Sequence, residues 1–212
     1  MRLNRHSFIR RRNSMNLSIT SMFYRAFASV LLLSLLASCT TVLVRTTGAE
    51  GIQEDPTERT AGAVVEDQSI ETKVIVNLKK LEPELKKANI DVISHNGVVL
   101  LVGQVASEAL KTRATQITSE SSTKIKRIHN ELEVAGKTGL LARSNDNWVA
   151  TKVRTLMLAN SSVPSGQIRV ITENGAVFLM GLVTQADADA AADLARNVSG
   201  VTRVVKVFEY LN

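Results

Sequence analysis

Two short stretches of this sequence decide its fold: residues 96–105 read NGVVLLVGQV, and residues 174–183 read NGAVFLMGLV. Six of the ten paired positions are identical at a constant offset of 78 residues. An Asn-Gly pair between apolar runs is a strong signal of a tight β-hairpin, because both residues tolerate a positive φ. Each stretch therefore predicts a hairpin turn and the strand that follows it.

The similarity continues on both sides of the two hairpins. Upstream, Thr72, Lys73 and Val74 recur at residues 151–153, and downstream, residues 125–128 resemble residues 201–204. The offset changes by only one or two residues between these segments, as small insertions in loops would produce. The sequence therefore predicts a duplicated unit of about 70 residues.

Each copy shows the same order of periodic segments. Both copies open with an apolar helical face, formed by Ile70, Val74 and Leu78 in the first and by Val149, Val153, Leu156 and Met157 in the second. A hairpin follows, then a second helix with Ser107 or Thr184 as its N-cap, then a closing strand. The sequence predicts an α+β fold of two tandem α-β-β-α-β domains, each a three-stranded sheet with two helices on one face.

The first forty residues have the pattern of an export signal. Six arginines and no acid fall within residues 1–38, and an apolar run covers residues 26–37. That run is shorter than the roughly 20 residues of a membrane-spanning helix, but it suits a signal peptide. Residues 36–39 read LASC, which resembles the bacterial lipoprotein signal and implies cleavage before Cys39 and acylation of Cys39. A buried, inert thiol is the alternative for this single cysteine.

The predicted organisation has five parts. They are a lipoprotein signal peptide (1–38), a lipidated N-terminus and flexible tether (39–66), a first domain (67–134), a linker (135–145) and a second domain (146–212). Met15 and Met22 are alternative starts that would shorten the signal peptide. The formal charge of +6 resides in the signal peptide, because the remaining 174 residues hold 20 basic and 20 acidic side chains. This balance argues against a nucleic-acid partner.

The opening helix, the hairpin with its second glycine and the closing V-x-x-V segment resemble the BON domain, and both copies fit. Together with Cys39, the pattern is similar to dual-BON outer-membrane lipoproteins. The resemblance implies a protein that is lipid-anchored in the outer membrane and faces the periplasm. Thr40, which follows the cysteine, is compatible with export to that membrane.

The sequence offers little for catalysis. Outside the signal peptide there are two histidines, His95 and His129, and neither recurs in the second copy. We predict both to be surface residues, and we predict no enzyme activity, no metal site and no cofactor, because no nucleophile or ligand cluster is apparent.

Trp148 is the strongest candidate for a functional residue. At 100° per residue, it lies roughly 110–120° from the predicted core face of its helix. Lys152 and Thr155 share its stripe, and Arg154 and Leu158 flank it. An exposed Trp beside cations is typical of a lipid-headgroup interface. The alternative is that Trp148 packs beneath the other domain.

The resemblance supports the lipid hypothesis. It implies that the second domain binds anionic phospholipids of the outer membrane, through Trp148, Lys152, Arg154, Thr155 and Leu158. It also implies enrichment at the division site and a role in envelope integrity. The competing hypothesis is a protein-interaction scaffold for the outer-membrane assembly machinery or for cell-wall hydrolase regulators, without direct lipid recognition.

Overall fold

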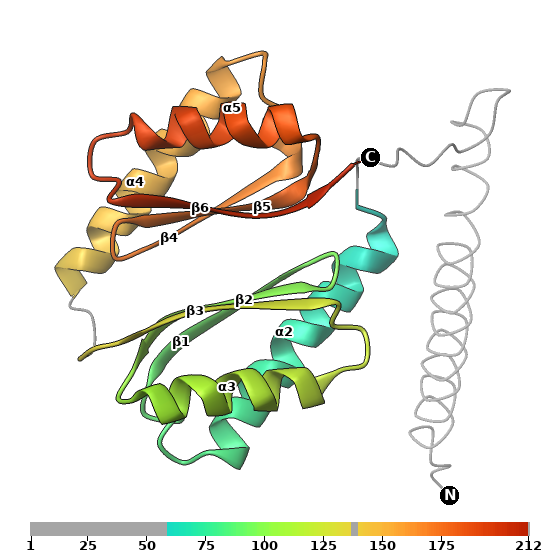
Figure 1. The fold of residues 1–212 in the computed structure, drawn as a ribbon, viewed down its shortest axis with the longest axis vertical. Coiled ribbons are helices and arrows are strands. Elements are labelled where there is room, and N and C mark those ends of the chain that lie inside the picture. Colours follow the sequence, from blue (N-terminus) through green and yellow to red (C-terminus); the bar gives the residue numbers. More distant parts are fainter. Residues whose placement is uncertain (1–58, 137–139, 212) are drawn as a thin grey trace, which may run out of the picture. The chain divides into compact units, whose positions relative to one another are not determined.

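The structure is a computed structural model that describes residues 59–136 and 140–211. The first domain contains α2 (Ala61–Leu81), β1 (Asn89–His95), β2 (Val98–Val105), α3 (Glu108–Ser121) and β3 (Arg127–Val134). The second contains α4 (Leu140–Ala159), the 3₁₀ turn η1 (Ser165–Gln167), β4 (Ile168–Glu173), β5 (Ala176–Val183), α5 (Gln185–Arg196) and β6 (Arg203–Tyr210) (Figure 1). This order confirms the predicted pair of α-β-β-α-β domains. The predicted signal peptide and Cys39 lie outside the described residues.

The two sheets have the same topology. β2 is the central strand of the first sheet, antiparallel to β1 and parallel to β3, and β5 occupies the same place between β4 and β6. Asn96 and Gly97 have φ values of 51° and 80°, and Asn174 and Gly175 have 50° and 77°. These angles confirm the two Asn-Gly turns. α3 and α5 are the crossover helices that a parallel strand pair requires.

In each domain, the two helices cover one face of the sheet (Figure 1). The apolar face predicted for α2 is buried there, as are Leu110, Ala114 and Ile117 of α3 and Ala188, Ala192 and Ala195 of α5. Ser107 and Thr184 are the predicted N-caps of α3 and α5. The prediction for α4 is wrong at Leu156, which is 44% exposed. Met157, Val153 and Val149 form the core face instead, so the buried side of α4 lies further round the helix from Trp148.

The opposite faces of the two sheets share one buried apolar cluster. It consists of Ile93, Val98, Leu100 and Val102 from the first domain and Ala176, Phe178, Met180 and Val207 from the second. Every residue of β2 is buried, because its alternate side chains point into this cluster and into the helix-covered core. The sheet faces opposite the helices therefore pack on each other.

Polar contacts around this cluster are reciprocal. The Asn96 side-chain amide of the first turn donates to Glu209 Oε1 of β6 at 2.8 Å. In the same way, the Asn174 amide of the second turn donates to Glu133 Oε2 of β3 at 3.2 Å. Equivalent side chains thus contact equivalent strands in both directions, as in the isologous interface of a two-fold dimer.

Both opening helices start earlier than the sequence indicates. α2 begins at Ala61, inside the predicted tether, because the Thr60 hydroxyl caps it by accepting from the Ala63 backbone N–H. α4 begins at Leu140, inside the predicted linker of residues 135–145. Of that linker, residues 137–139 lie outside the described part of the chain.

Candidate functional site

Trp148 lies on the solvent side of α4, and 60% of it is exposed. It therefore does not pack beneath the first domain. The Lys152 ammonium lies 5.1 Å from the centroid of the Trp148 ring, in the range of a cation–π contact. Leu156 and Leu158 are 44% and 73% exposed on the same helix. One helix thus presents an indole, a cation and two leucines to solvent.

A shallow groove of about 480 Å³ runs beside the indole ring. We call it the α4 groove; its lining residues are Trp148, Thr151, Lys152, Thr155, Leu156 and residues 197–199, which follow α5. The predicted site residues Trp148, Lys152 and Thr155 therefore come together in one place. Leu156, expected in the core, is part of this surface instead.

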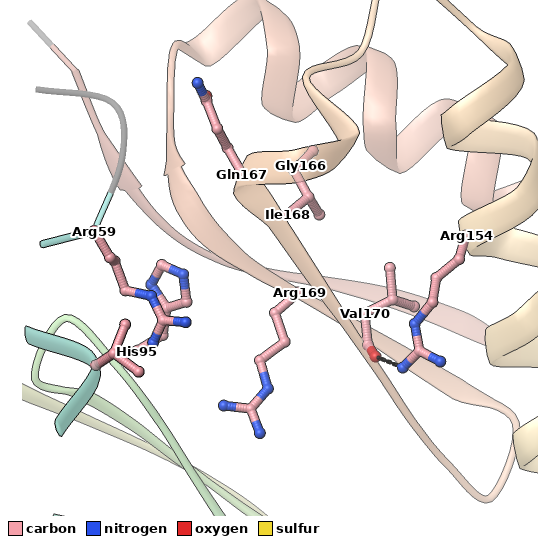
Figure 2. A pocket seen from close by; sticks show the side chains of 9 residues that line it. Arg59, His95, Arg154, Gly166, Gln167, Ile168, Arg169 and Val170 are labelled. Carbon is pink, nitrogen blue, oxygen red and sulfur yellow. Dashed lines mark hydrogen bonds between the residues drawn. The ribbon is translucent and has the colours of Figure 1, made fainter. Parts of the chain in front are cut away.

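Arg154 and Leu158 do not line the α4 groove. Arg154 reaches to the adjacent strand, where its Nη2 donates to the Val170 carbonyl oxygen at 2.6 Å (Figure 2). Leu158 is exposed outside the groove lining. The five residues predicted as one phospholipid face thus occupy more than one side of α4.

A second cavity, of about 470 Å³, lies where Arg154 points. We call it the arginine pocket; it is lined by Arg59, Val64, His95, Arg154 and residues 166–170 (Figure 2). Sequence reasoning did not find this site, because its cationic residues are far apart along the chain.

The two histidines differ from the prediction that both are surface residues. His95, at the end of β1, is 7% exposed. Burial, followed by the positive charges of Arg59 and Arg169, lowers the pKa of His95 to about 4, although Asp67 opposes this shift. His95 is therefore neutral near pH 7. His129 is half-buried, and burial also lowers its pKa, with Arg127 contributing.

A buried carboxylate supports the first hairpin turn. Asp67 of α2 is 3% exposed and accepts from the backbone N–H groups of Asn96 and Gly97 at 2.7 and 2.9 Å, and from the Ser94 hydroxyl at 2.7 Å. Burial alone would raise the pKa of Asp67, but the hydrogen bonds from Gly97, Ser94, Asn96 and Arg59 outweigh it and lower the pKa.

The second hairpin turn repeats the arrangement. Asp146 of α4 is 4% exposed and accepts from the backbone N–H groups of Asn174 and Gly175, both at 2.8 Å. The sequence contained a signal for this role of Asp67 and Asp146, because both copies of the duplicated unit carry an acid at the same position. An acid on a helix that must pack against a sheet needs fixed donors.

The described residues contain neither a candidate metal site nor a membrane-spanning helix. Within residues 59–136 and 140–211, no three His, Cys, Asp or Glu side chains are grouped so that they could hold a metal ion. None of the described helices has the length and apolar character needed to cross a membrane.

Comparisons with known proteins agree with the duplicated architecture. The family model of the BON domain matches twice, over residues 66–136 and 145–212. The chain is 40% identical to the 21 kDa hemolysin of Actinobacillus pleuropneumoniae over 72% of its length and 78% of the relative. It is 38% identical to the outer membrane lipoprotein DolP of Haemophilus influenzae over 77% of this chain and 83% of the relative. It is 28% identical to the osmotically-inducible protein Y of Escherichia coli over 75% of this chain and 80% of the relative. The chain therefore belongs to the BON-domain family, of which it carries two tandem copies.

Proposed function

We propose that this protein is an outer-membrane lipoprotein of the DolP type, without enzymatic activity, that binds anionic phospholipid through α4 of its second domain. The similarity to a relative named outer membrane lipoprotein supports the location. The observation that carries the lipid-binding role is the exposed indole of Trp148 with the Lys152 ammonium over its ring.

The chemistry of this surface suits the boundary between headgroups and acyl chains. An indole ring favours that boundary, exposed leucines favour the region beneath it, and each Lys or Arg near an anionic leaflet contributes about 1 kcal/mol. Lys152 is the cation beside Trp148, whereas Arg154 bonds to Val170. We therefore assign the headgroup contact to Lys152 first.

The first domain lacks this surface at the equivalent positions. α2 carries Ser69 where α4 carries Trp148, and Lys79 where α4 carries Leu158, at an offset of 79 residues. Lys73 is retained at the position of Lys152. Lys73 thus has no indole and no leucine at the equivalents of Trp148 and Leu158, so the proposal assigns lipid binding to the second domain.

Acylation of Cys39 would place this weak lipid surface close to the membrane. A tether raises the effective lipid concentration at the surface, so a low-affinity contact can respond to the local content of anionic lipid. We propose that this response positions the protein, with enrichment at the division site, and that the positioned protein helps to maintain envelope integrity.

Co-sedimentation with phosphatidylglycerol vesicles tests the lipid surface, using the chain without residues 1–39. We expect Lys152→Glu to weaken binding roughly thirtyfold, because reversing one charge changes two elementary charges at about 1 kcal/mol each. Trp148→Glu should weaken binding at least as much, because it removes the indole and adds an anion.

Matched controls are available in the first domain. Ser69→Glu and Lys73→Glu place the same charges at the equivalent positions of α2 and should leave binding nearly unchanged. If Trp148→Glu and Lys152→Glu bind vesicles as the unmodified chain does, the lipid proposal is wrong. The surface would then serve the competing scaffold role in outer-membrane assembly or cell-wall remodelling.

The anchor has its own test. Cys39→Ala removes the thiol that acylation requires, and the protein should move from the membrane fraction to the soluble periplasmic fraction. Ser38→Ala, which keeps a small residue before the cysteine, is the control and should remain in the membrane fraction. Continued membrane fractionation of Cys39→Ala would contradict the predicted lipid anchor.

A further inference from the structure

The arginine pocket is lined by cations from separate segments of the chain. Arg59 precedes α2, Arg154 belongs to α4 and Arg169 to β4, while His95 ends β1. Figure 2 shows the Arg169 side chain in the view between His95 and Arg154. Of the described residues that line the pocket, none is Asp or Glu. The lining therefore attracts anions.

The three guanidinium groups keep donor capacity for a ligand. Arg59 uses Nη1 for Asp67, and Arg169 uses Nη1 for Glu71 Oε1 and the Ser94 carbonyl oxygen. Arg154 uses Nη2 for the Val170 carbonyl oxygen. Within the described part of the chain, one nitrogen of each guanidinium is thus engaged, and each group has five N–H donors. These contacts hold the side chains, and none of the remaining guanidinium donors bonds to another described residue.

The acids behind the pocket do not cancel its charge. Asp67 accepts hydrogen bonds from the backbone N–H groups of the turn between β1 and β2 and also forms an ion pair with Arg59. Glu71 accepts from the Ser94 backbone N–H at 2.8 Å in addition to Arg169. Arg154 bonds only to a neutral carbonyl among the described residues. Among residues 59–136 and 140–211, two acids therefore face three guanidinium cations.

The fold itself does not require these cations. The duplicated first domain carries Ile75 at the position of Arg154 and Asp91 at the position of Arg169. In the opposite comparison, the second domain carries Glu173 at the position of His95. Because both copies form the same fold, the cationic character is a feature of this one pocket.

His95 fits an anion site without contributing charge. Its pKa of about 4 leaves the imidazole neutral near pH 7, with one N–H to donate. Burial is the main cause of the low pKa of His95, with Arg59 and Arg169 contributing and Asp67 opposing.

We propose that the arginine pocket binds a phosphate group carried by a small polar molecule of the size of glycerol phosphate. Guanidinium forks match phosphate oxygens in pairs, and charge-assisted bonds of this kind are the strong ones. A cavity of about 470 Å³ exceeds what one inorganic ion fills and lies within the range of small-ligand sites. The phosphate comes either from a soluble metabolite or from a lipid headgroup.

This site is independent of the proposed lipid surface. None of the residues that line the α4 groove also lines the arginine pocket. A substitution in one site therefore leaves the lining of the other unchanged, and vesicle binding depends on the arginine pocket only if the bound phosphate belongs to a lipid headgroup.

Isothermal titration calorimetry of the full chain in nonionic detergent tests the proposal, with sn-glycerol 3-phosphate and inorganic phosphate as probes. Both should bind, and Arg169→Gln and Arg154→Ile should each weaken binding tenfold or more, because each removes charge-assisted hydrogen bonds. Arg154→Ile introduces the residue of the first domain, so the fold should accept it. Arg196→Gln, at the exposed end of α5, is the charge-matched control and should bind as the unmodified chain does.

The source of the phosphate follows from a second measurement. If Arg154→Ile loses glycerol 3-phosphate but keeps phosphatidylglycerol vesicle binding, the ligand is a soluble phosphate. If both are lost, the ligand is the lipid headgroup. The proposal is wrong if neither probe binds at millimolar concentration. It is also wrong if Arg196→Gln weakens binding as much as Arg169→Gln does, or if Trp148→Glu abolishes phosphate binding.

Discussion

Replacing Gly103 with alanine is expected to lower the free energy of unfolding by about 3–5 kcal/mol. A Cβ at this position would lie 2.0 Å from the backbone carbonyl oxygen of Asn89 on the neighbouring strand, so the two strands would have to separate. Gly103 also has a φ of 120°, which a residue with a side chain rarely adopts. The clash and the strained backbone add to each other.

Replacing two other glycines with alanine should destabilise the protein less than Gly103→Ala does. A Cβ on Gly181, the equivalent residue of β5, would lie 2.3 Å from the Gln167 carbonyl oxygen, but no positive φ adds to the cost. Gly181→Ala should therefore be less destabilising than Gly103→Ala. A Cβ on Gly136 would have no neighbouring atom within 4 Å, so Gly136→Ala should change stability by less than about 0.5 kcal/mol. Urea unfolding followed by circular dichroism measures all three, and equal midpoints would refute the ranking.

Local patterns were sufficient to predict the elements of each domain. Asn96 and Gly97 specify a turn because few other pairs accept two positive φ values, and the duplicate pair at residues 174–175 repeats the signal. The helical faces through Ile70 and Val74 depend only on the period of the helix. Such signals involve neighbours in sequence, so no knowledge of tertiary packing is needed.

The packing of the two sheets was not predicted, although part of the signal was present. β2 and β5 are apolar at nearly every position, and a strand with only one buried face should alternate. That pattern indicates a second covered face, but it does not say what covers it. The side chains of Phe178 and Leu100 meet only because the two domains are paired.

The candidate sites also combine features that local sequence predicts with features that depend on tertiary packing. Helical geometry placed Trp148 away from the core face of its helix but left open whether the other domain covers it, and the structure shows it exposed. The direction of Arg154 depended on the nearby Val170 carbonyl of β4. A long arginine side chain can reach either side of its helix, so sequence position alone does not fix its partner. The arginine pocket could not be predicted from the sequence either, because residues 59, 95 and 169 come together only in the folded chain.

Asp67→Asn is expected to lower the free energy of unfolding by about 2–4 kcal/mol at neutral pH. The carboxylate accepts hydrogen bonds on both oxygens, from Asn96 on one and from Gly97 and Ser94 on the other. An asparagine amide has one accepting oxygen, so its NH₂ group would face a backbone N–H, and a buried donor would lose its partner. Asp91→Asn, on the exposed side of β1, is the matched control and should have little effect.

The effect of Asp67→Asn should also depend on pH. The folded-state pKa of Asp67 lies below its ordinary value of 3.8, so the fold stabilises the ionised form. Its contribution is complete above about pH 5 and declines as the pH falls through 3.8 towards the folded-state pKa, because unfolding then takes up a proton. The difference between the unmodified chain and Asp67→Asn, measured by urea unfolding, should therefore shrink in acid. A difference that stays constant down to about pH 2 would show that the charge of Asp67 does not stabilise the turn.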